Sequence, residues 1–269
     1  MTRDELAAQF SAVGLERGSK VLVHSSLRSI GQVDGGADAV VAALLDVVGE
    51  KGLLVVPAFT YDTARFDGTE PGRAGTIAEA ARLRDDAVRS WHPTYSVAAI
   101  GGDAEELCYA HELHAGTDVD TPLDRLASTC GSVLLIGVGH VANTTVHVGE
   151  FHANAAYLEI PFSPSWPHEH VLAMGPNGER KVRYQRFPGC SRAFGLVEHG
   201  LRERGAVQDG TVGKALAQRV DAKAIIEETV ALLRRDPAAL LCTDPRCYRC
   251  SRARELLIRG RAAAADSGG

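Results

Sequence analysis

Four short apolar runs separated by amphipathic segments constrain the fold of this chain more than any other feature. The runs are KVLVHSSL at 20–27, GLLVVPAFTYD at 52–62, TYSVAAIGG at 94–102 and GSVLLIGVG at 131–139. Continuous apolar strands are typical of a sheet that is buried on both faces. The segment GGADAVVAALLDVVG at 35–49 has the apolar spacing of a helix that packs on such a sheet and ends at Gly49. The sequence therefore predicts an α/β fold with helices on both faces of the sheet.

Further segments fit a single domain over residues 1–258. Helices are predicted over 3–13 with Thr2 as cap, over TPLDRLA with Thr121 as cap and Pro122 at the first position, and over DAKAIIEETVALLRR. The stretch 153–192 is rich in Pro, Gly and aromatic residues and is predicted to be an irregular insertion or lid. Residues 259–269 are expected to form a disordered tail.

Composition and charge exclude some classes of partner. Hydrophobic residues make up 45% of the 269 residues, enough for a sizeable core. The net charge of −5 argues against nucleic acid, because phosphate binding requires concentrated Lys and Arg. The N-terminal charge pattern does not match a signal peptide, and no apolar run is long enough to cross a bilayer. We expect a cytoplasmic protein without membrane contact, and a homodimer is compatible with the sequence.

The segment HSSLRSIGQVDGGADAV at 24–40 joins a strand to a helix that starts after Gly36. Its backbone N–H groups, its hydroxyls and the helix N-terminus can together hold a phosphate. It matches neither the Walker pattern nor G-x-G-x-x-G. Taken alone, an ordinary strand-to-helix loop with glycine turns explains it equally well.

The segment NTTVHVGEFH at 143–152 combines a histidine and a glutamate at the start of a predicted helix. With Asn143 as N-cap, His147 falls in the first or second turn, and Glu150 shares its face because the two are three residues apart. A helix N-terminus disfavours the imidazolium, and a neutral imidazole is what a general base for an amine requires. The alternative is a core histidine satisfied by hydrogen bonds.

The tail CTDPRCYRC holds Cys242, Cys247 and Cys250. A zinc site would need a fourth ligand, such as Cys190 or a histidine. Without a second C-x-x-C, we favour free structural thiols over a metal. The cluster HEH at 168–170 is more typical of surface polar residues than of a metal site.

Taken in order, these segments resemble the aminoglycoside 3-N-acetyltransferase family, antibiotic N-acetyltransferases with a fold unrelated to GNAT. The resemblance rests on the segments from VLVHSSLRSIGQVDGG to FTYD, HPTYSVAAIGG, TPLDRLAS, GSVLLIGVGHVANTTVHVGE and VGKALAQRVDAKAIIEETVALL, which span most of residues 18–235. It implies a three-layer α/β/α sandwich with a central mixed sheet. It also implies acetyl-CoA as co-substrate, no metal, and an amine of a cationic aminosugar as acceptor.

The resemblance also assigns roles by position. His147 corresponds to the catalytic base, with Glu150 or Glu179 as the acid that orients it. Tyr61 and Asp62 in FTYD, together with Glu179, are expected to contact the aminosugar. The coenzyme A site is expected to comprise His24, Ser25, Ser26, Leu27, Arg28, Ser29, Val33, Gly35, Gly36 and Ser96.

Two departures from the family keep other hypotheses open. Gln185 and Arg186 stand where many members carry an acid, and the 153–192 insertion and cysteine tail also differ. An acyltransferase of the same fold that acts on a different amine, such as an antibiotic-pathway intermediate, is the alternative. A non-catalytic protein that sequesters a cationic ligand or a metal is a third hypothesis.

Overall fold

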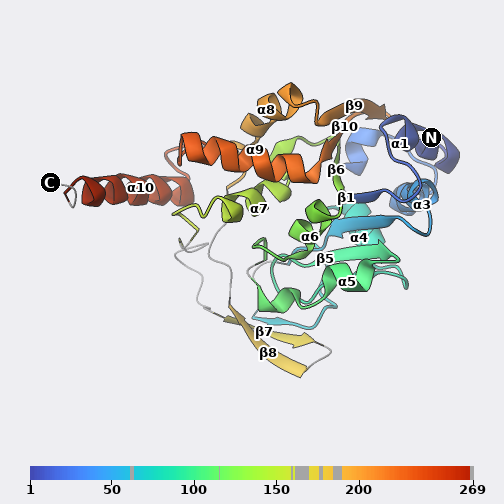
Figure 1. Cartoon of the computed structure of the whole chain (residues 1–269). Coiled ribbons are helices and arrows are strands. Elements are labelled where there is room, and N and C mark those ends of the chain that lie inside the picture. The colour runs from blue at the N-terminus through green and yellow to red at the C-terminus, as the bar shows by residue number, and fades with distance from the viewer. Residues whose placement is uncertain are drawn as a thin grey trace.

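A seven-stranded sheet runs through the centre of the computed structural model in the order β4-β5-β2-β1-β6-β10-β9 (Figure 1). The structure describes residues 1–60, 64–114, 116–158, 160, 170–175, 178–183 and 190–266. The strands are β1 Lys20–Ser25, β2 Leu53–Pro57, β4 Val88–Arg89, β5 Val97–Gly101, β6 Ser132–Ile136, β9 Val207–Val212 and β10 Ala215–Asp221. The four apolar runs of the sequence contain β1, β2, β5 and β6, so the predicted heart of the sheet is confirmed.

The strand directions make the sheet mixed, as expected. β1 pairs in parallel with β2 and β6, whereas β5 and β10 run antiparallel to their inner neighbours. The carboxyl ends of β1, β2 and β6, at Ser25, Pro57 and Ile136, therefore lie at one edge of the sheet. We call this the carboxyl edge, and loops that follow parallel strands converge there.

Helices cover both faces of the sheet. Their bounds are α1 Arg3–Ala12, α2 Leu27–Ile30, α3 Gly36–Val48, α4 Thr76–Arg82, α5 Ala104–Cys108, α6 Pro122–Ser128, α7 Thr145–His152, α8 Val197–Glu203, α9 Ala222–Arg235 and α10 Tyr248–Asp266, with short 3-10 turns η1 His111–Leu113, η2 His140–Ala142 and η3 Phe194–Leu196. The predicted caps hold at Thr2, which forms a capping box with Glu5, and at Asp221, which accepts from the backbone of Ala224. Pro122 occupies the first turn of α6 as expected.

Alternate residues along the strands feed two separate cores. Val21 and Val23 of β1 pack into the core that contains α1, α3 and α4, which we call the first core. Leu22 packs into the second core, with α6, α7 and α9. Side chains of a strand point alternately to opposite faces. The three-layer α/β/α sandwich is therefore confirmed.

A second, three-stranded sheet lies apart from the main one, at the lower edge of Figure 1. It pairs β3 Arg65–Phe66 in parallel with β7 His170–Gly175, and β7 forms a hairpin with β8 Gly178–Arg183. Phe66, Val171, Ala173 and Val182 form its small core, against which Trp91 packs. The predicted irregular stretch 153–192 thus includes a regular hairpin. Its parts at 159, 161–169, 176–177 and 184–189 lie outside the described residues.

Helix α10 extends away from the rest of the molecule (Figure 1) and continues to Asp266. The sequence led us to expect disorder from residue 259, but the alanine run at 262–265 has high helix propensity and favours continuation of the helix. Within the described part of the chain, no helix combines the length and apolar character needed to span a bilayer.

Candidate active site

A pocket of about 360 Å³ is built around the loops at the carboxyl edge. The residues that line it are Phe59, Tyr95, Val141, Ala142, Asn143, Thr144, His147, Ser191, Phe194 and Arg249. They come from the segment after β2, the turn before β5, the segment between β6 and α7, and two later segments of the chain. A concave site outside strand ends is where α/β folds bind ligands.

His147 enters this pocket from the first turn of α7. The N-cap of α7 is Thr144 and not Asn143, which was the predicted cap. The Asn143 side chain still serves the helix start, because its Oδ1 accepts from the backbone N–H of Thr145 at 3.1 Å. The side-chain bond reaches the first helical residue instead of the second or third, so the cap moves by one position and His147 stays in the first turn, as predicted.

His147 and Glu150 contact each other directly. Nδ1 of His147 lies 2.6 Å from Oε2 of Glu150, and the glutamate is fully buried. The prediction that these residues share one face of the helix is confirmed. A buried carboxylate requires partners, and His147 supplies one of them.

Tyr157 supplies the second partner of Glu150. Its hydroxyl donates to Oε1 at 2.9 Å, and the residue is fully buried. Burial, followed by the neighbouring Glu150, raises the pKa of the Tyr157 phenol, so the hydroxyl keeps its proton and acts as donor. Because the carboxylate accepts at both oxygens, Nδ1 of His147 carries the ring proton. Nε2 is then the basic nitrogen of a ring that lines the pocket.

Phe194 fixes the plane of the imidazole. The two rings meet edge to face, with centroids 4.6 Å apart and an interplanar angle of 71°. Such a contact leaves the ring one orientation, and only 9% of the His147 side chain is exposed. His147 is thus held by Glu150 at one nitrogen and by Phe194 across its face.

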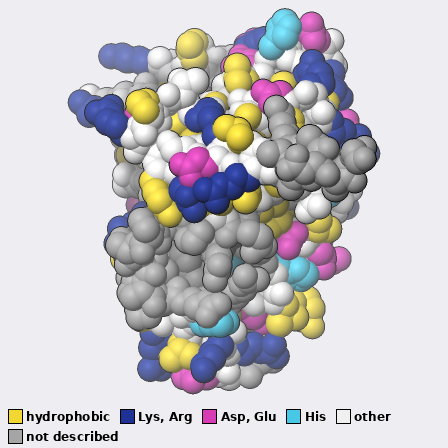
Figure 2. Space-filling model, turned by 90° about the vertical axis from the view of Figure 1, so that its left-hand side faces the viewer, with side chains coloured by type: hydrophobic (Ala, Val, Ile, Leu, Met, Phe, Trp, Pro, Cys, Tyr) yellow, Lys and Arg dark blue, Asp and Glu magenta, His cyan; other side chains and the backbone are white. Residues whose placement is uncertain are grey.

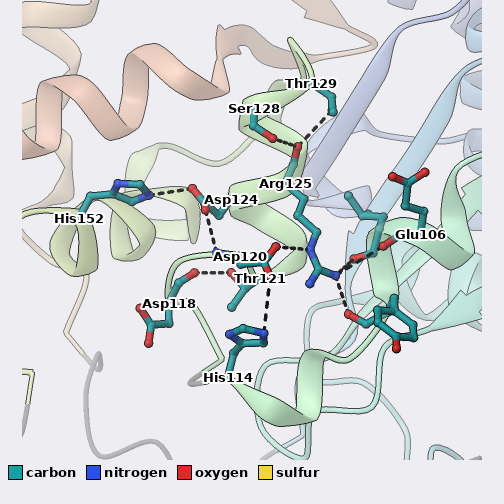
Figure 3. Close-up of polar contacts among 12 residues, drawn as sticks. Glu106, His114, Asp118, Asp120, Thr121, Asp124, Arg125, Ser128, Thr129 and His152 are labelled. Carbon is teal, nitrogen blue, oxygen red and sulfur yellow. Dashed lines mark hydrogen bonds and ion pairs between the residues drawn. The ribbon is translucent and has the colours of Figure 1, made fainter.

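The far end of α7 is tied to α6. His152 Nε2 lies 2.7 Å from Oδ1 of Asp124, whose Oδ2 accepts from the backbone of Asp120 (Figure 3). Arg125 joins the same network through Asp120 and donates to the carbonyls of Leu107 and Tyr109. These contacts link α6 to the end of α5 and to α7, so the helix that carries His147 is fixed at both ends.

The loop over 24–36 is more ordered than the sequence indicated. It contains the short helix α2, which Ser26 caps by accepting from the backbone of Ser29 at 3.3 Å. Ser29 also donates to Ser26 Oγ and to the carbonyl of Gly137, which follows β6. Gly35 and Gly36 have φ of 84° and 62°, and α3 starts at Gly36 as predicted, without a side-chain cap.

His24 lies beneath the pocket and not on its surface. It is buried, and Nε2 accepts from the backbone N–H of Thr144 at 3.4 Å. Burial lowers the pKa of its imidazole to about 4, which keeps the ring neutral. His24 therefore joins the loop after β1 to the start of α7.

Other predicted site residues lie in different surroundings. Ser96 is fully buried, and its hydroxyl donates to the carbonyl of Ala58 at 2.7 Å and accepts from Arg89. Glu179 is exposed on β8 and does not line the described pocket. Tyr61 and Asp62, and also Gln185 and Arg186, lie outside the described residues.

The structure adds residues that the sequence did not single out. Tyr157 lies beyond the end of α7, and Phe194 lies far along the chain, so neither carried a local pattern. Phe59 and Tyr95 pack edge to face at 5.3 Å in the pocket wall. The structure also places Cys190 beside Cys242, Cys247 and Cys250.

Comparison with known proteins agrees with this geometry. The sequence profile of the family described as aminoglycoside 3-N-acetyltransferase matches residues 22–234. The chain is 30% identical over 241 residues to aminoglycoside N(3)-acetyltransferase IV of Salmonella sp., covering 88% of this chain and 89% of that protein. It is 31% identical over 270 residues to aminoglycoside N(3)-acetyltransferase VII of Streptomyces paromomycinus, covering 86% and 91%.

Solved structures give the same result. The apoenzyme of aminoglycoside acetyltransferase AAC(3)-IVa matches with a TM-score of 0.82 at 30% identity, covering 95% of this chain and 97% of that one. AAC(3)-IVa has also been solved with a gentamicin, and AAC-IIIb, which matches with a TM-score of 0.73 at 26% identity over 87% of this chain and 97% of that one, with CoASH. The chain belongs to the aminoglycoside 3-N-acetyltransferase family.

Proposed function

We propose that the protein transfers the acetyl group of acetyl-CoA to the 3-amino group of a 2-deoxystreptamine aminoglycoside, with His147 as the general base. The observation that carries this proposal is the chain of hydrogen bonds from Tyr157 through Glu150 to His147, which ends at the pocket. Family membership and the names of the relatives support the reaction class.

In the proposed mechanism, Nε2 of His147 takes a proton from the acceptor amine as its nitrogen attacks the thioester carbonyl. The C–N bond forms, the C–S bond breaks, and the imidazolium returns the proton to the departing CoA thiolate. Glu150 stabilises the imidazolium through Nδ1, as the carboxylate does in a catalytic triad. The transfer needs no cysteine intermediate. General base catalysis supplies roughly 10²–10⁴-fold, and positioning of both substrates supplies the rest.

The donor is proposed to bind along the loop that joins β1 to α3. The uncapped N-terminus of α3 offers backbone N–H groups to a phosphate, and Arg28 is exposed beside it in the sequence. Backbone N–H groups at 25–31 would stabilise the oxyanion. The complex of AAC-IIIb with CoASH supports a coenzyme site in a relative of the same fold. Ser96, whose hydroxyl is engaged with Ala58, would hold the wall of that site instead of contacting pantetheine.

The acceptor is proposed to enter from the side of residues 58–62 and the β7–β8 hairpin. Tyr61, Asp62 and Glu179 are its proposed contacts, and the 153–192 region acts as a lid of the single domain 1–258. Arg89 holds the segment after β2 by donating to the carbonyls of Ala58 and Gly68, each at 2.7 Å. That anchoring would fix the direction in which Tyr61 and Asp62 leave the sheet.

One observation favours a different acceptor. Among the described residues that line the pocket, there is an arginine but no Asp or Glu. A polycationic sugar would be expected to meet carboxylates there. We therefore keep a second candidate, an acyltransferase of the same fold that acts on an amine carrying less positive charge.

The test is to incubate the purified protein with acetyl-CoA and a panel of aminoglycosides and to follow the products by mass spectrometry. Thiol dyes are unsuitable because the chain has six cysteines. We expect a mass gain of one acetyl group, located at the 3-amino nitrogen by NMR, and a loss of turnover by about 10²–10⁴-fold in His147→Ala. Turnover of smaller amines with none of the aminoglycosides would favour the second candidate. Full activity of His147→Ala would remove His147 as the base.

A further inference from the structure

Four cysteine side chains gather at one point outside the reaction described above. The sulfurs of Cys190, Cys242, Cys247 and Cys250 all lie within 4.8 Å of one another. Cys190, Cys242 and Cys250 are buried, and Cys247 is half-buried. They come from three places in the chain: the segment before η3, the segment after α9 and the first turn of α10. All four are free thiols.

The spacing of the sulfurs matches a tetrahedral metal site. Zinc binds thiolates at about 2.3 Å, so four ligands around one ion lie about 3.8 Å apart. Sulfurs already within 4.8 Å of one another need only a small contraction to reach that distance. Four Cys in one cluster also exceeds what a disulfide requires, which is a single pair.

Backbone groups around the cluster favour the thiolate form that a metal requires. The N–H of Arg192 donates to the sulfur of Cys190, and the N–H of Cys250 donates to the sulfur of Cys247. A thiolate is a better acceptor for such bonds than a thiol is. The C-x-x-C spacing places this second donor at the opposite end of the motif.

Positive charge also surrounds the cluster. Arg192, Arg246, Arg249 and Arg252 each lie within two residues of one of the cysteines in the sequence. The face from which α10 projects carries several Lys and Arg side chains (Figure 2). A tetrathiolate zinc centre has a net charge of −2, which nearby guanidinium groups offset.

We propose that Cys190, Cys242, Cys247 and Cys250 bind one Zn²⁺ ion in a closed structural site. Binding of the ion displaces the four thiol protons, and no ligand position is left for water or substrate. The site is independent of the acetyl transfer proposed above. It corrects our preference from the sequence for free thiols, which failed because Cys190 is far from the other three along the chain.

The position of the site gives it a role in shaping the pocket. Ser191 and Arg249 line the pocket, and each is the immediate neighbour of a ligand, Cys190 or Cys250. Phe194, four residues after Cys190, packs on His147. The metal would therefore hold one wall of the pocket and the base of α10, whose first turn buries Cys250 and Ala253 completely.

The experiment measures zinc in protein purified under reducing conditions without chelators and without a metal-binding tag. We expect one zinc per chain by elemental analysis. The apo protein, titrated with Co²⁺, should show the visible absorption bands of a tetrahedral thiolate complex. Cys247→Ser, at the least buried ligand, should lose both signals. The matched control is Cys130→Ser, which changes an exposed cysteine outside the cluster and should keep both.

The outcomes separate the alternatives. Zinc far below one per chain, together with no Co²⁺ spectrum in the reduced protein, would overturn the proposal in favour of free thiols. A disulfide among these cysteines in protein that takes up no metal after reduction would also overturn it. If Cys247→Ser does not fold, Cys247→Ala and chelator treatment of the wild-type protein provide the same readout, with zinc release and a lower Tm as the expected result.

Discussion

The hydroxyl of Tyr157 donates to Oε1 of Glu150 at 2.9 Å, while Oε2 of the same carboxylate holds His147 at 2.6 Å. The glutamate is therefore satisfied on both oxygens by protein groups. Its position does not depend on water, so the histidine that it orients is held in one tautomer before any substrate binds.

Glu150→Gln should lower kcat by about 10²–10⁴-fold, because an amide cannot stabilise the imidazolium by charge. KM for the acceptor should change little, since Glu150 is buried beneath His147. Steady-state kinetics provides the measurement. A wild-type kcat in Glu150→Gln would show that the carboxylate has only a structural role.

Tyr157→Phe should have a smaller effect of the same kind. The ring keeps its packing and only one donor to Glu150 is lost, so we expect kcat to fall by about 10-fold, or about 1.4 kcal/mol. The pH profile of kcat should shift with it, because the carboxylate loses a partner. An unchanged profile together with a lowered Tm would mean that the hydroxyl serves stability alone.

His152→Ala tests whether His147 is special among the histidines of α7. His152 pairs with Asp124, but 34% of its side chain is exposed, so the pair should contribute no more than about 1 kcal/mol to stability. We expect kcat to stay near the wild-type value and the unfolding midpoint to fall slightly. An effect on kcat as large as that of His147→Ala would show that the α6 network of Figure 3 controls the reaction.

Gly149→Ala should destabilise the protein by about 1–3 kcal/mol. Gly149 lies where α7 meets α9, and an added Cβ would overlap the side chain of Thr229. Because Gly149 stands between His147 and Glu150, displacement of α7 should also lower kcat. The matched control is Gly195→Ala, where no atom lies within 4 Å of the new Cβ and the free energy of unfolding should change little. Equal stability of the two variants, measured by urea unfolding, would contradict the close packing of these helices.

Stability should fall as the pH is lowered from about 6.5 toward 4. Burial lowers the pKa of His24 to about 4 and that of His111 to about 3. Both rings stay neutral in the folded state, whereas the unfolded chain takes up protons below about 6.5. The stability is therefore complete above pH 6.5, and at pH 5 each histidine removes about 2 kcal/mol.

Urea unfolding at pH 7.5 and pH 5 provides the test. His24→Gln should reduce the loss between the two conditions. His199→Gln, at a side chain that is 85% exposed, should leave the loss unchanged. A loss that is the same in all three proteins would show that other groups cause it.

The sequence predicted those elements whose pattern is local. β1, β2, β5 and β6 are buried on both faces and therefore appear as apolar runs, and α3 has a full amphipathic period with glycine at each end. β9 was not identified as a strand, because its side chains are mostly exposed and give no continuous apolar run. The β7–β8 hairpin escaped for a similar reason, since only a few of its residues enter a core.

The site divides in the same way. His147 and Glu150 could be paired from sequence because helical geometry fixes residues three apart. Tyr157, Phe194 and Cys190 could not, since only the folding of distant segments brings them to α7 or to the cysteine tail. A cluster of thiols is invisible to spacing when one member comes from another part of the chain.

The two cores on opposite faces of the sheet have a kinetic consequence. The loop proposed for the donor is rooted in the first core through Ile30 and Val40, whereas α7 is rooted in the second through Val146 and Val148. They meet where His24 accepts from Thr144. Under the proposed roles, small packing defects in the first core should appear mainly in KM for acetyl-CoA, and defects in the second mainly in kcat. The fold would then allow affinity for the donor and speed of transfer to be tuned by separate sets of buried side chains.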